Sequence, residues 1–188
     1  MRFARWTYLF LSLQAAALAQ TAGPPAGVSS EWDVRKLLDN LERQAQHLKP
    51  ILDQVNPATW KGAPEAYAAQ WKSTEAELRY LITASQALSR NPERLTLALD
   101  TYMRMQALET RLGSLIEGIR KYQNPALADL AQSMIVENST NRDQLSQYLR
   151  DLAEQKEQEF QIADREAQRC RGVILNQPAT KDRKATQR

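Results

Sequence analysis

Residues 92–122, PERLTLALDTYMRMQALETRLGSLIEGIRKY, have the most regular hydrophobic pattern of this 188-residue chain. One set of side chains recurs at alternating steps of four and three, which places the set on one side of an α-helix. Its members are Thr101, Met105, Leu108, Leu112, Leu115, Ile119 and Tyr122. Four further residues widen this side: Leu95, Leu99, Tyr102 and Ile116. A wide apolar side is typical of a helix with more than one neighbour, so we expect the central helix of a bundle here.

The two segments before this helix show the same spacing. The first seam consists of Val34, Leu38, Leu41, Ala45, Leu48, Leu52 and Val55, and the second of Tyr67, Trp71, Thr74, Leu78, Leu81, Ser85 and Leu88. Ser29 and Ser30 offer N-cap hydroxyls for the first helix, and Pro64 suits the first position of the second. Pro50 predicts a kink rather than a break, because the apolar register continues across it. The two helices should form an antiparallel hairpin.

Asparagine and proline precede both later helices. Asn91, Pro92 and Glu93 supply an N-cap, a first-turn proline and an acidic residue in order, and Asn124 and Pro125 repeat the first two. These signals predict helix starts at Pro92 and at Pro125. The run at residues 95–99 alternates like a strand, but it continues into helical periodicity and is assigned to the helix.

The last helix has a polar interruption, NSTNRD, at residues 138–143. Before it, we expect four residues to pack against the bundle: Leu127, Leu130, Met134 and Ile135. After it, the apolar seam resumes with Leu145, Leu149, Leu152, Phe160, Ala163, Ala167 and Cys170. Either the helix continues through a polar layer or it turns there into a fifth helix. Unbroken, it would be about 69 Å long against about 46 Å for the central helix. Its charged end would then project beyond the bundle, and we expect that end to contact another chain.

The chain has only six glycines and few β-branched runs, which favours helix-on-helix packing. The prediction is therefore an all-α fold, an antiparallel up-down four-helix bundle with an overlong or split C-terminal helix of coiled-coil character. This domain should span residues 29–176.

The first nineteen residues have the pattern of a signal peptide. A basic start with Arg2 and Arg5 precedes an apolar run at residues 6–19, which ends in the small-x-small sequence ALA. This pattern predicts cleavage before Gln20. A stable anchor needs about 20 apolar residues, and no later stretch comes close. The mature chain should therefore be exported, periplasmic or extracellular, and have no stable membrane anchor.

Residues 20–28 are expected to be a flexible linker, and residues 177–188 a basic disordered tail. The formal charge of +3 describes mainly the leader and this tail. Between them the chain is close to neutral, which argues against binding to nucleic acid. The tail could contact a phosphate-bearing envelope polymer, although a solvated chain end is the simpler interpretation.

Trp60-Lys61-Gly62, followed by Tyr67 and Trp71, resembles the small secreted helical hairpins named for a Trp-x-Gly turn. The resemblance covers roughly residues 30–90. It implies a stand-alone hairpin exported without a cleavable leader. Because this chain has a predicted leader and two further long helices, we do not assign it to that family.

No cofactor and no catalytic activity are expected. A di-metal carboxylate bundle needs Glu-x-x-His on two helices, and the chain has one histidine, His47, with Gln44 three positions before it. Covalent haem needs two cysteines, and the chain has one. No serine, threonine or acid pair has a nearby base. Neighbouring carboxylates such as Glu75 and Glu77 fall on different sides of a helix.

The candidate interaction residues are Trp32, Trp60, Tyr67, Trp71, Phe160 and Cys170. The aromatic residues could hold an apolar ligand at a bundle end. The simpler interpretation is that Tyr67 and Trp71 lie in the core and that Trp60 closes over them. Cys170 lies between two arginines, which favour the thiolate form of its side chain. It could link two chains through a disulfide, or it could be an ordinary small apolar residue of the seam.

The sequence thus favours a non-catalytic protein that uses its long last helix to bind an unknown protein partner or itself. The competing hypothesis is a carrier that holds a small apolar ligand at a bundle end lined by Trp32, Trp60 and Trp71.

Overall fold

The computed structural model describes residues 31–175. In this range the chain forms helices joined by short turns. The elements are α1 (Glu31–Leu52), the 3-10 helix η1 (Pro57–Thr59), α2 (Ala66–Arg90), α3 (Leu95–Tyr122) and α4 (Pro125–Leu175). No strand occurs between residues 31 and 175. The predicted all-α class with four long helices is therefore confirmed.

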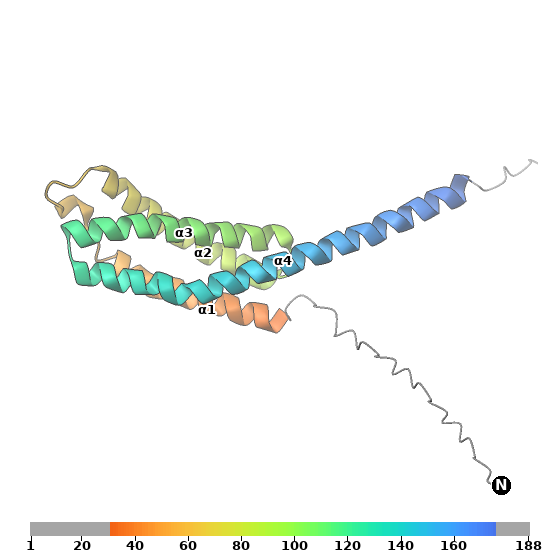
Figure 1. Ribbon diagram of the computed structural model, residues 1–188, viewed down its shortest axis with the longest axis horizontal. Coiled ribbons are helices and arrows are strands. Elements are labelled where there is room, and N and C mark those ends of the chain that lie inside the picture. Colours follow the sequence, from red (N-terminus) through yellow and green to blue (C-terminus); the bar gives the residue numbers. More distant parts are fainter. Residues whose placement is uncertain (1–30, 176–188) are drawn as a thin grey trace, which may run out of the picture.

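The four α-helices surround a common core. α1 packs against α2 and α4, and α3 packs against the same two helices. Figure 1 shows α1, α2, α3 and the first half of α4 side by side, while the second half of α4 extends beyond the other helices. Fully buried side chains come from all four helices, for example Leu38, Leu81, Met105 and Leu145. Each helix thus buries one side against its neighbours, in a bundle-like arrangement.

The predicted seams form this core. Every member of the first seam is buried, and so are the members of the second seam from Thr74 to Leu88. Tyr67 and Trp71 are partly buried and pack against the core. In the central helix the seam is buried from Thr101 to Ile119. The alternation of three and four steps therefore identified the buried side of each of these helices.

Two leucines that were expected to pack are about half exposed, Leu99 at 48% and Leu130 at 50%. Alanines hold the core positions beside them: Ala98, Ala128 and Ala131 are fully buried. A residue one step along a helix is rotated by about 100°, so each leucine lies outside the core. The expectation for these two residues is wrong because alanine, rather than the larger apolar residue, faces the neighbouring helices.

The predicted helix start at Pro92 is also wrong. The helix begins at Leu95, and residues 91–94 form a turn in which Arg94 N donates a hydrogen bond to Asn91 O at 3.2 Å. Asparagine at the first position and proline at the second suit a β-turn as well as a helix start. The same local signal therefore fits two structures.

The other proline signals mark helix ends more closely. The prediction at Pro125 is confirmed, because it is the first residue of α4, and Asn124 Oδ1 accepts a hydrogen bond from Ala126 N at 2.9 Å. α2 begins at Ala66, two residues after Pro64. Assignments of helix ends commonly differ by one or two residues.

α1 passes through Pro50 without a break and ends two residues later at Leu52. Beyond the helix end, Val55 is buried as predicted. Gln54 Nε2 donates a hydrogen bond to the carbonyl oxygen of Pro50 at 3.0 Å, which helps to close the end of the helix.

The polar stretch at residues 138–143 does not interrupt α4, which runs for 51 residues against 28 for α3. At 1.5 Å per residue, α4 is about 77 Å long and α3 about 42 Å. Of the two alternatives, a single overlong helix is thus the one observed.

The predicted leader, linker and basic tail and the capping serines Ser29 and Ser30 lie outside the described residues. Among residues 31–175, no helix combines the length and the apolar character needed to cross a bilayer.

Candidate interaction surface

The second half of α4 projects from the bundle, as Figure 1 shows in blue. Leu145 and Leu152 are 0% and 1% exposed, and they mark the last part of α4 that the other helices cover. From Glu157 to Arg171 every residue is exposed. We call residues 154–175 the arm and the rest of the described chain the body.

One apolar row runs along the arm. Its members are Phe160, Ala163, Ala167, Cys170 and Ile174, and we call them the arm stripe. Together with Leu145, Leu149 and Leu152 of the body, and with Lys156 between the two groups, they recur on average about every 3.6 residues, which is the period of a straight α-helix. The arm stripe therefore lies on the same face of α4 that packs into the body.

The arm stripe is open to solvent. Phe160 and Ile174 are 73% and 69% exposed, and Cys170 is a free, exposed thiol. The structure thus places the predicted residues Phe160 and Cys170 on one face of one helix. Ile174 completes the row and was missed in the sequence, where residues 173–175 were not assigned to the seam. Ile162, which is 51% exposed, lies off the stripe.

A shallow hollow lies at the base of the arm. Its lining consists of Leu95, Ala153, Lys156, Glu157, Phe160 and Gln161, and we call it the basal hollow. Leu95 comes from the first turn of α3, whereas the other residues belong to α4. The hollow therefore forms where α4 leaves the body.

Charge is unevenly distributed along the arm. The half nearer the body carries Glu154, Lys156, Glu157, Glu159 and Asp164, and the outer half Arg165, Glu166, Arg169 and Arg171. Lys156 Nζ lies 2.9 Å from Glu159 Oε2. Hydrogen bonds from Lys156 and then from Gln155 lower the pKa of Glu159. The inner half is thus acidic and the outer half basic.

The polar stretch of α4 anchors the helix to the body just before the arm. Asn141 is buried, and its Nδ2 donates hydrogen bonds to Gln44 Oε1 at 2.8 Å and to Asn138 Oδ1 at 3.2 Å. Arg142 Nη1 lies 3.2 Å from Glu109 Oε2 of α3, and this hydrogen bond raises the pKa of Arg142. These contacts join the polar stretch of α4 to α1 and α3, in the part of the body that precedes the arm.

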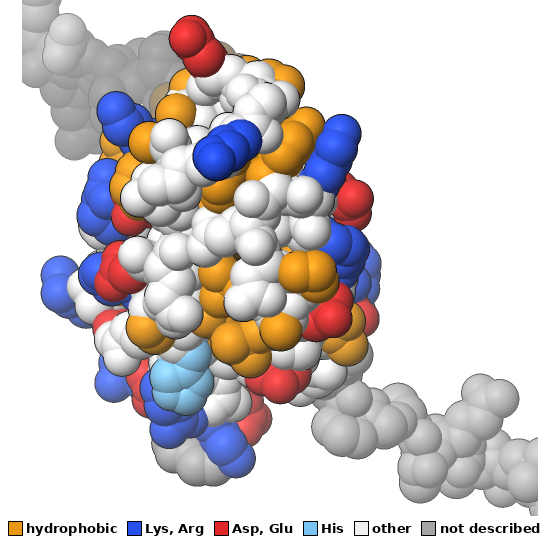
Figure 2. Space-filling model, turned by 90° about the vertical axis from the view of Figure 1, so that its left-hand side faces the viewer, with side chains coloured by type: hydrophobic (Ala, Val, Ile, Leu, Met, Phe, Trp, Pro, Cys, Tyr) orange, Lys and Arg blue, Asp and Glu red, His pale blue; other side chains and the backbone are white. Residues whose placement is uncertain are grey.

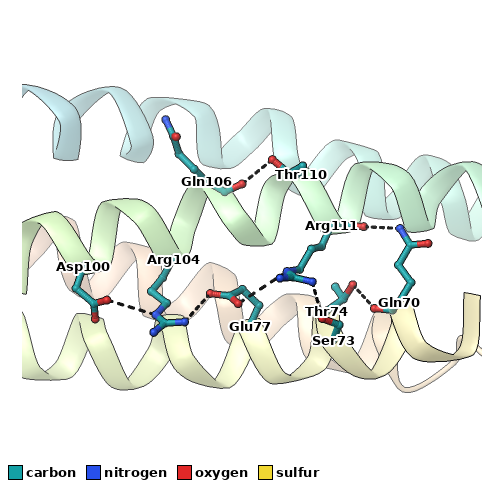
Figure 3. Close-up of polar contacts among 9 residues, drawn as sticks. All are labelled: Gln70, Ser73, Thr74, Glu77, Asp100, Arg104, Gln106, Thr110 and Arg111. Atoms are coloured by element: carbon teal, nitrogen blue, oxygen red, sulfur yellow. Dashed lines mark hydrogen bonds and ion pairs between the residues drawn. The ribbon is translucent and has the colours of Figure 1, made fainter. Parts of the chain in front are cut away.

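A second polar network joins α2 to α3, as Figure 3 shows. Glu77 is buried, and its carboxylate lies 3.2 Å from Arg104 Nη1 and 3.9 Å from Arg111 Nε. Arg104 also contacts Asp100 at 3.4 Å, and Arg111 Nη1 donates to Ser73 Oγ at 2.5 Å. The hydrogen bond with Glu77 is the main cause that raises the pKa of Arg104.

The role of Glu77 was missed in the sequence, where the residue was considered only as a member of a carboxylate pair. The available signal was the spacing of Arg104 and Arg111, which are seven residues apart and therefore share one face of α3. The contacts of Glu77 fix α2 and α3 relative to each other.

The aromatic residues close the end of the body opposite the arm. The ring centroids of Trp60 and Tyr67 are 5.4 Å apart, and those of Trp60 and Tyr122 are 5.9 Å apart. Trp60 Nε1 donates to Gln123 Oε1 at 2.9 Å, and Trp71 Nε1 donates to Leu52 O at 3.1 Å. The indoles therefore pack and hydrogen-bond within the protein.

Figure 2 looks onto this end and shows hydrophobic side chains interspersed with polar and charged ones. His47 is exposed. Trp32 lies in the first turn of α1, about 30 Å along that helix from Leu52, and its side chain is outside the described residues. The backbone therefore places Trp32 at the opposite end of the bundle from Trp60 and Trp71.

Within residues 31–175, no group of three or more His, Cys, Asp or Glu side chains is arranged to hold a metal ion. Comparisons with protein-family models, with curated proteins and with solved structures gave no match.

Proposed function

We propose that this chain is an exported, non-catalytic protein that binds another protein chain through the arm. The observation that carries the proposal is the arm stripe, an apolar row that continues the core-facing side of α4 and that no other helix of the described chain covers. Apolar rows on exposed helices are typical of helix-to-helix or helix-in-groove recognition. We infer that the arm acts as a coiled-coil-like segment.

The topology that we infer for the body is an antiparallel up-down bundle. Gln123, after α3, accepts a hydrogen bond from Asn56 N at 3.1 Å and donates one to Gln54 O at 2.7 Å, so the α1–α2 and α3–α4 connections lie together. The Tyr148 hydroxyl donates to the carbonyl oxygen of Pro92, which places the α2–α3 connection beside the middle of α4. These contacts support alternating helix directions. They also support an arm that leaves the body at the end of the bundle where the α2–α3 connection lies.

The energetics of an isolated helix also favour a partner for the arm. Most of the stability of a helix in a protein comes from the packing of its apolar face, and no other helix of the described chain packs against the arm stripe. Lys156 and Glu159 form an ion pair along the helix, but exposed pairs contribute little because water and salt screen them. Covering the arm stripe would add hydrophobic burial that the body does not provide.

The proposed export rests on the leader pattern of residues 1–19, with its arginines, its apolar run and its small-x-small ending.

The carrier hypothesis has less support. Trp60 is buried against Tyr67 and Tyr122, and the indole nitrogens of Trp60 and Trp71 already have acceptors. The hollow beside Trp60 measures about 540 Å³, which is within the range of about 300–1,000 Å³ for sites of small organic ligands, but it is open to solvent, whereas such sites bury most of the ligand. A second pocket, between Leu41, Leu81 and Met134, measures about 20 Å³ and holds about one water molecule.

Site-specific photo-crosslinking in the cells that make the protein tests the proposal. A photoreactive residue at position 160 lies on the arm stripe, and one at position 162 is its matched control on another face of the same turn. We expect a covalent adduct with a protein chain at position 160 and little or none at position 162. Absence of an adduct at 160, or equal yields at both positions, would show that the stripe is not a binding face.

A further inference from the structure

We propose that the arm pairs with the arm of a second copy of this chain, and that the two helices run antiparallel. The inference rests on the proposed function, which requires only that some protein chain covers the arm stripe. The symmetry of the stripe, the position of the apolar tip and the distribution of charge all favour a second copy.

Four positions of the arm stripe are spaced symmetrically about residue 165. Ala163 and Ala167 lie at equal distances from that centre, and so do Phe160 and Cys170. In an antiparallel pair centred there, Ala163 faces Ala167 of the second copy, and Phe160 faces Cys170 of the second copy. A large side chain thus meets a small one at each end of the contact, which is the complementarity that a two-fold interface requires.

The centre of the stripe is also the middle of the arm, between residue 154 near the body and residue 175 at the end of α4. Two antiparallel arms centred there overlap along their whole length of about 33 Å. The two bodies then lie at opposite ends of the pair and do not collide. A parallel pair would bring both bodies to the same end, side by side.

Antiparallel pairing also covers the apolar tip of each arm. Val173, Ile174 and Leu175 are exposed there. Position 174 of one copy lies opposite position 156 of the other, and Lys156 lines the basal hollow together with Leu95 and Phe160. The tip of each arm therefore reaches the hollow at the base of the other, so both apolar features are buried in one arrangement.

Charge favours the antiparallel direction. The acidic inner half of one arm faces the basic outer half of the other, and Glu157 of one copy lies beside Arg171 of the other, because both flank the arm stripe on the same side. A parallel pair would place acid beside acid and base beside base. At the centre, Asp164 lies beside Asp164 of the second copy and Glu166 beside Glu166, while Arg165 is on the outer side of each helix.

Cysteine cross-linking in the full chain tests this geometry. In the antiparallel pair the two Cys170 residues are offset by about 15 Å along the helices, whereas a disulfide needs Cα atoms within about 7 Å. Wild-type protein should therefore stay unlinked under mild oxidation. Phe160→Cys places a thiol opposite Cys170 of the second copy and should give a linked dimer. Ile162→Cys, which is exposed but off the stripe, should not.

A second set of variants keeps Phe160 in place. Chains carrying Cys170→Ala with either Ala163→Cys or Ala167→Cys should link when the two are mixed, and much less when either is alone. Sedimentation of the full chain should show a concentration-dependent dimer. Phe160→Asp should raise its dissociation constant by about tenfold or more, and Ile162→Asp should leave it unchanged.

Three results would overturn the proposal. Efficient linking of wild-type chains through Cys170 would show a parallel pair. A monomer at every concentration would rule out self-pairing, and an adduct with a different protein at position 160 would then leave the proposed function standing. A monomer that dimerises only after removal of residues 176–188 would show that the tail of the same chain covers the stripe.

Discussion

The two halves of α4 carry apolar residues on the same face and have opposite surroundings. In the body, Leu145 and Leu152 are 0% and 1% exposed, whereas Phe160 and Ile174 in the arm are 73% and 69% exposed. The helix is continuous between them. The difference is that α1, α2 and α3 lie beside the first half only, as Figure 1 shows. The hydrophobic period thus determines which face of a helix is apolar, and the lengths of the neighbouring helices determine how much of that face is covered.

The comparison separates stability from binding. Apolar side chains in the body contribute to the folding free energy because water leaves them when the chain folds. Apolar side chains in the arm remain exposed to water in the folded chain, so they add little to the folding free energy. Substitutions in the two halves should therefore affect different measurements.

The largest expected effect comes from truncating matched side chains in the two halves. Leu145→Ala should lower the free energy of unfolding by about 2–5 kcal/mol, because it leaves a cavity in the core. Phe160→Ala should change it by less than about 0.5 kcal/mol, as at other exposed positions. Urea unfolding in dilute solution measures both values. Similar losses for the two variants would break the distinction between body and arm.

The free energy of unfolding should depend on pH because of the Tyr148 hydroxyl, which donates a hydrogen bond to the carbonyl oxygen of Pro92. Burial, with a smaller effect from Glu93, raises the pKa of Tyr148 to about 12. An unfolded tyrosine titrates near pH 10, so this stabilisation is complete below about pH 10 and is lost as the pH rises towards about 12. The loss should reach about 2–3 kcal/mol by the linkage relation.

Tyr148→Phe supplies the control for this pH dependence. Its unfolding free energy should fall less steeply than that of the wild type between about pH 10 and 12. Parallel curves for the two proteins would mean that the Tyr148 hydroxyl does not contribute in this way.

Two glycines of α3 test the packing of the body end opposite the arm. A Cβ at Gly118 would lie 2.6 Å from Tyr67 Cε1 and 2.8 Å from Trp60 Cζ3, so Gly118→Ala should destabilise the fold by about 1–3 kcal/mol. Gly113 has open space around it, and Gly113→Ala should stabilise the fold by about 0.4–1 kcal/mol. Thermal unfolding compares the two variants. A stable Gly118→Ala variant would mean that the aromatic cluster is loosely packed.

The smallest effect should come from charge in the arm. Glu157→Arg and Arg171→Glu should each weaken arm pairing by about 0.2–1 kcal/mol, and combining them should restore it. Sedimentation equilibrium of the three variants at low salt measures the coupling. Additive losses in the double variant would show that these two residues do not face each other in the pair.

Much of the body could be predicted because its information is local. The seams of the first three helices follow from spacing alone, since residues on one face of a helix recur every three or four positions. The start at Pro125 also follows from adjacent residues. The start at Pro92 does not, because Asn91 and Pro92 suit a turn equally well and tertiary contacts, including the hydroxyl of Tyr148, decide between the two.

The non-local features could not be derived in this way. Within the continuous α4, the polar stretch at residues 138–143 is held by a hydrogen bond from Asn141 to Gln44, which lies 97 positions away in the chain. The network around Glu77 likewise depends on which face of α3 meets α2. For the candidate surface, the sequence identified Phe160 and Cys170 as members of one seam. Their exposure depends on how far along α4 the first residues of α1 and α3 lie.

Amide hydrogen exchange along α4, measured on the full chain in dilute solution, tests most directly whether one continuous helix has a covered and an uncovered half. We expect slow exchange from Leu127 to Leu152, including residues 138–143, and much faster exchange across residues 154–175. A fast-exchanging window at residues 138–143 between two slow segments would contradict the continuous helix. Exchange in residues 154–175 as slow as in the body would contradict the uncovered arm.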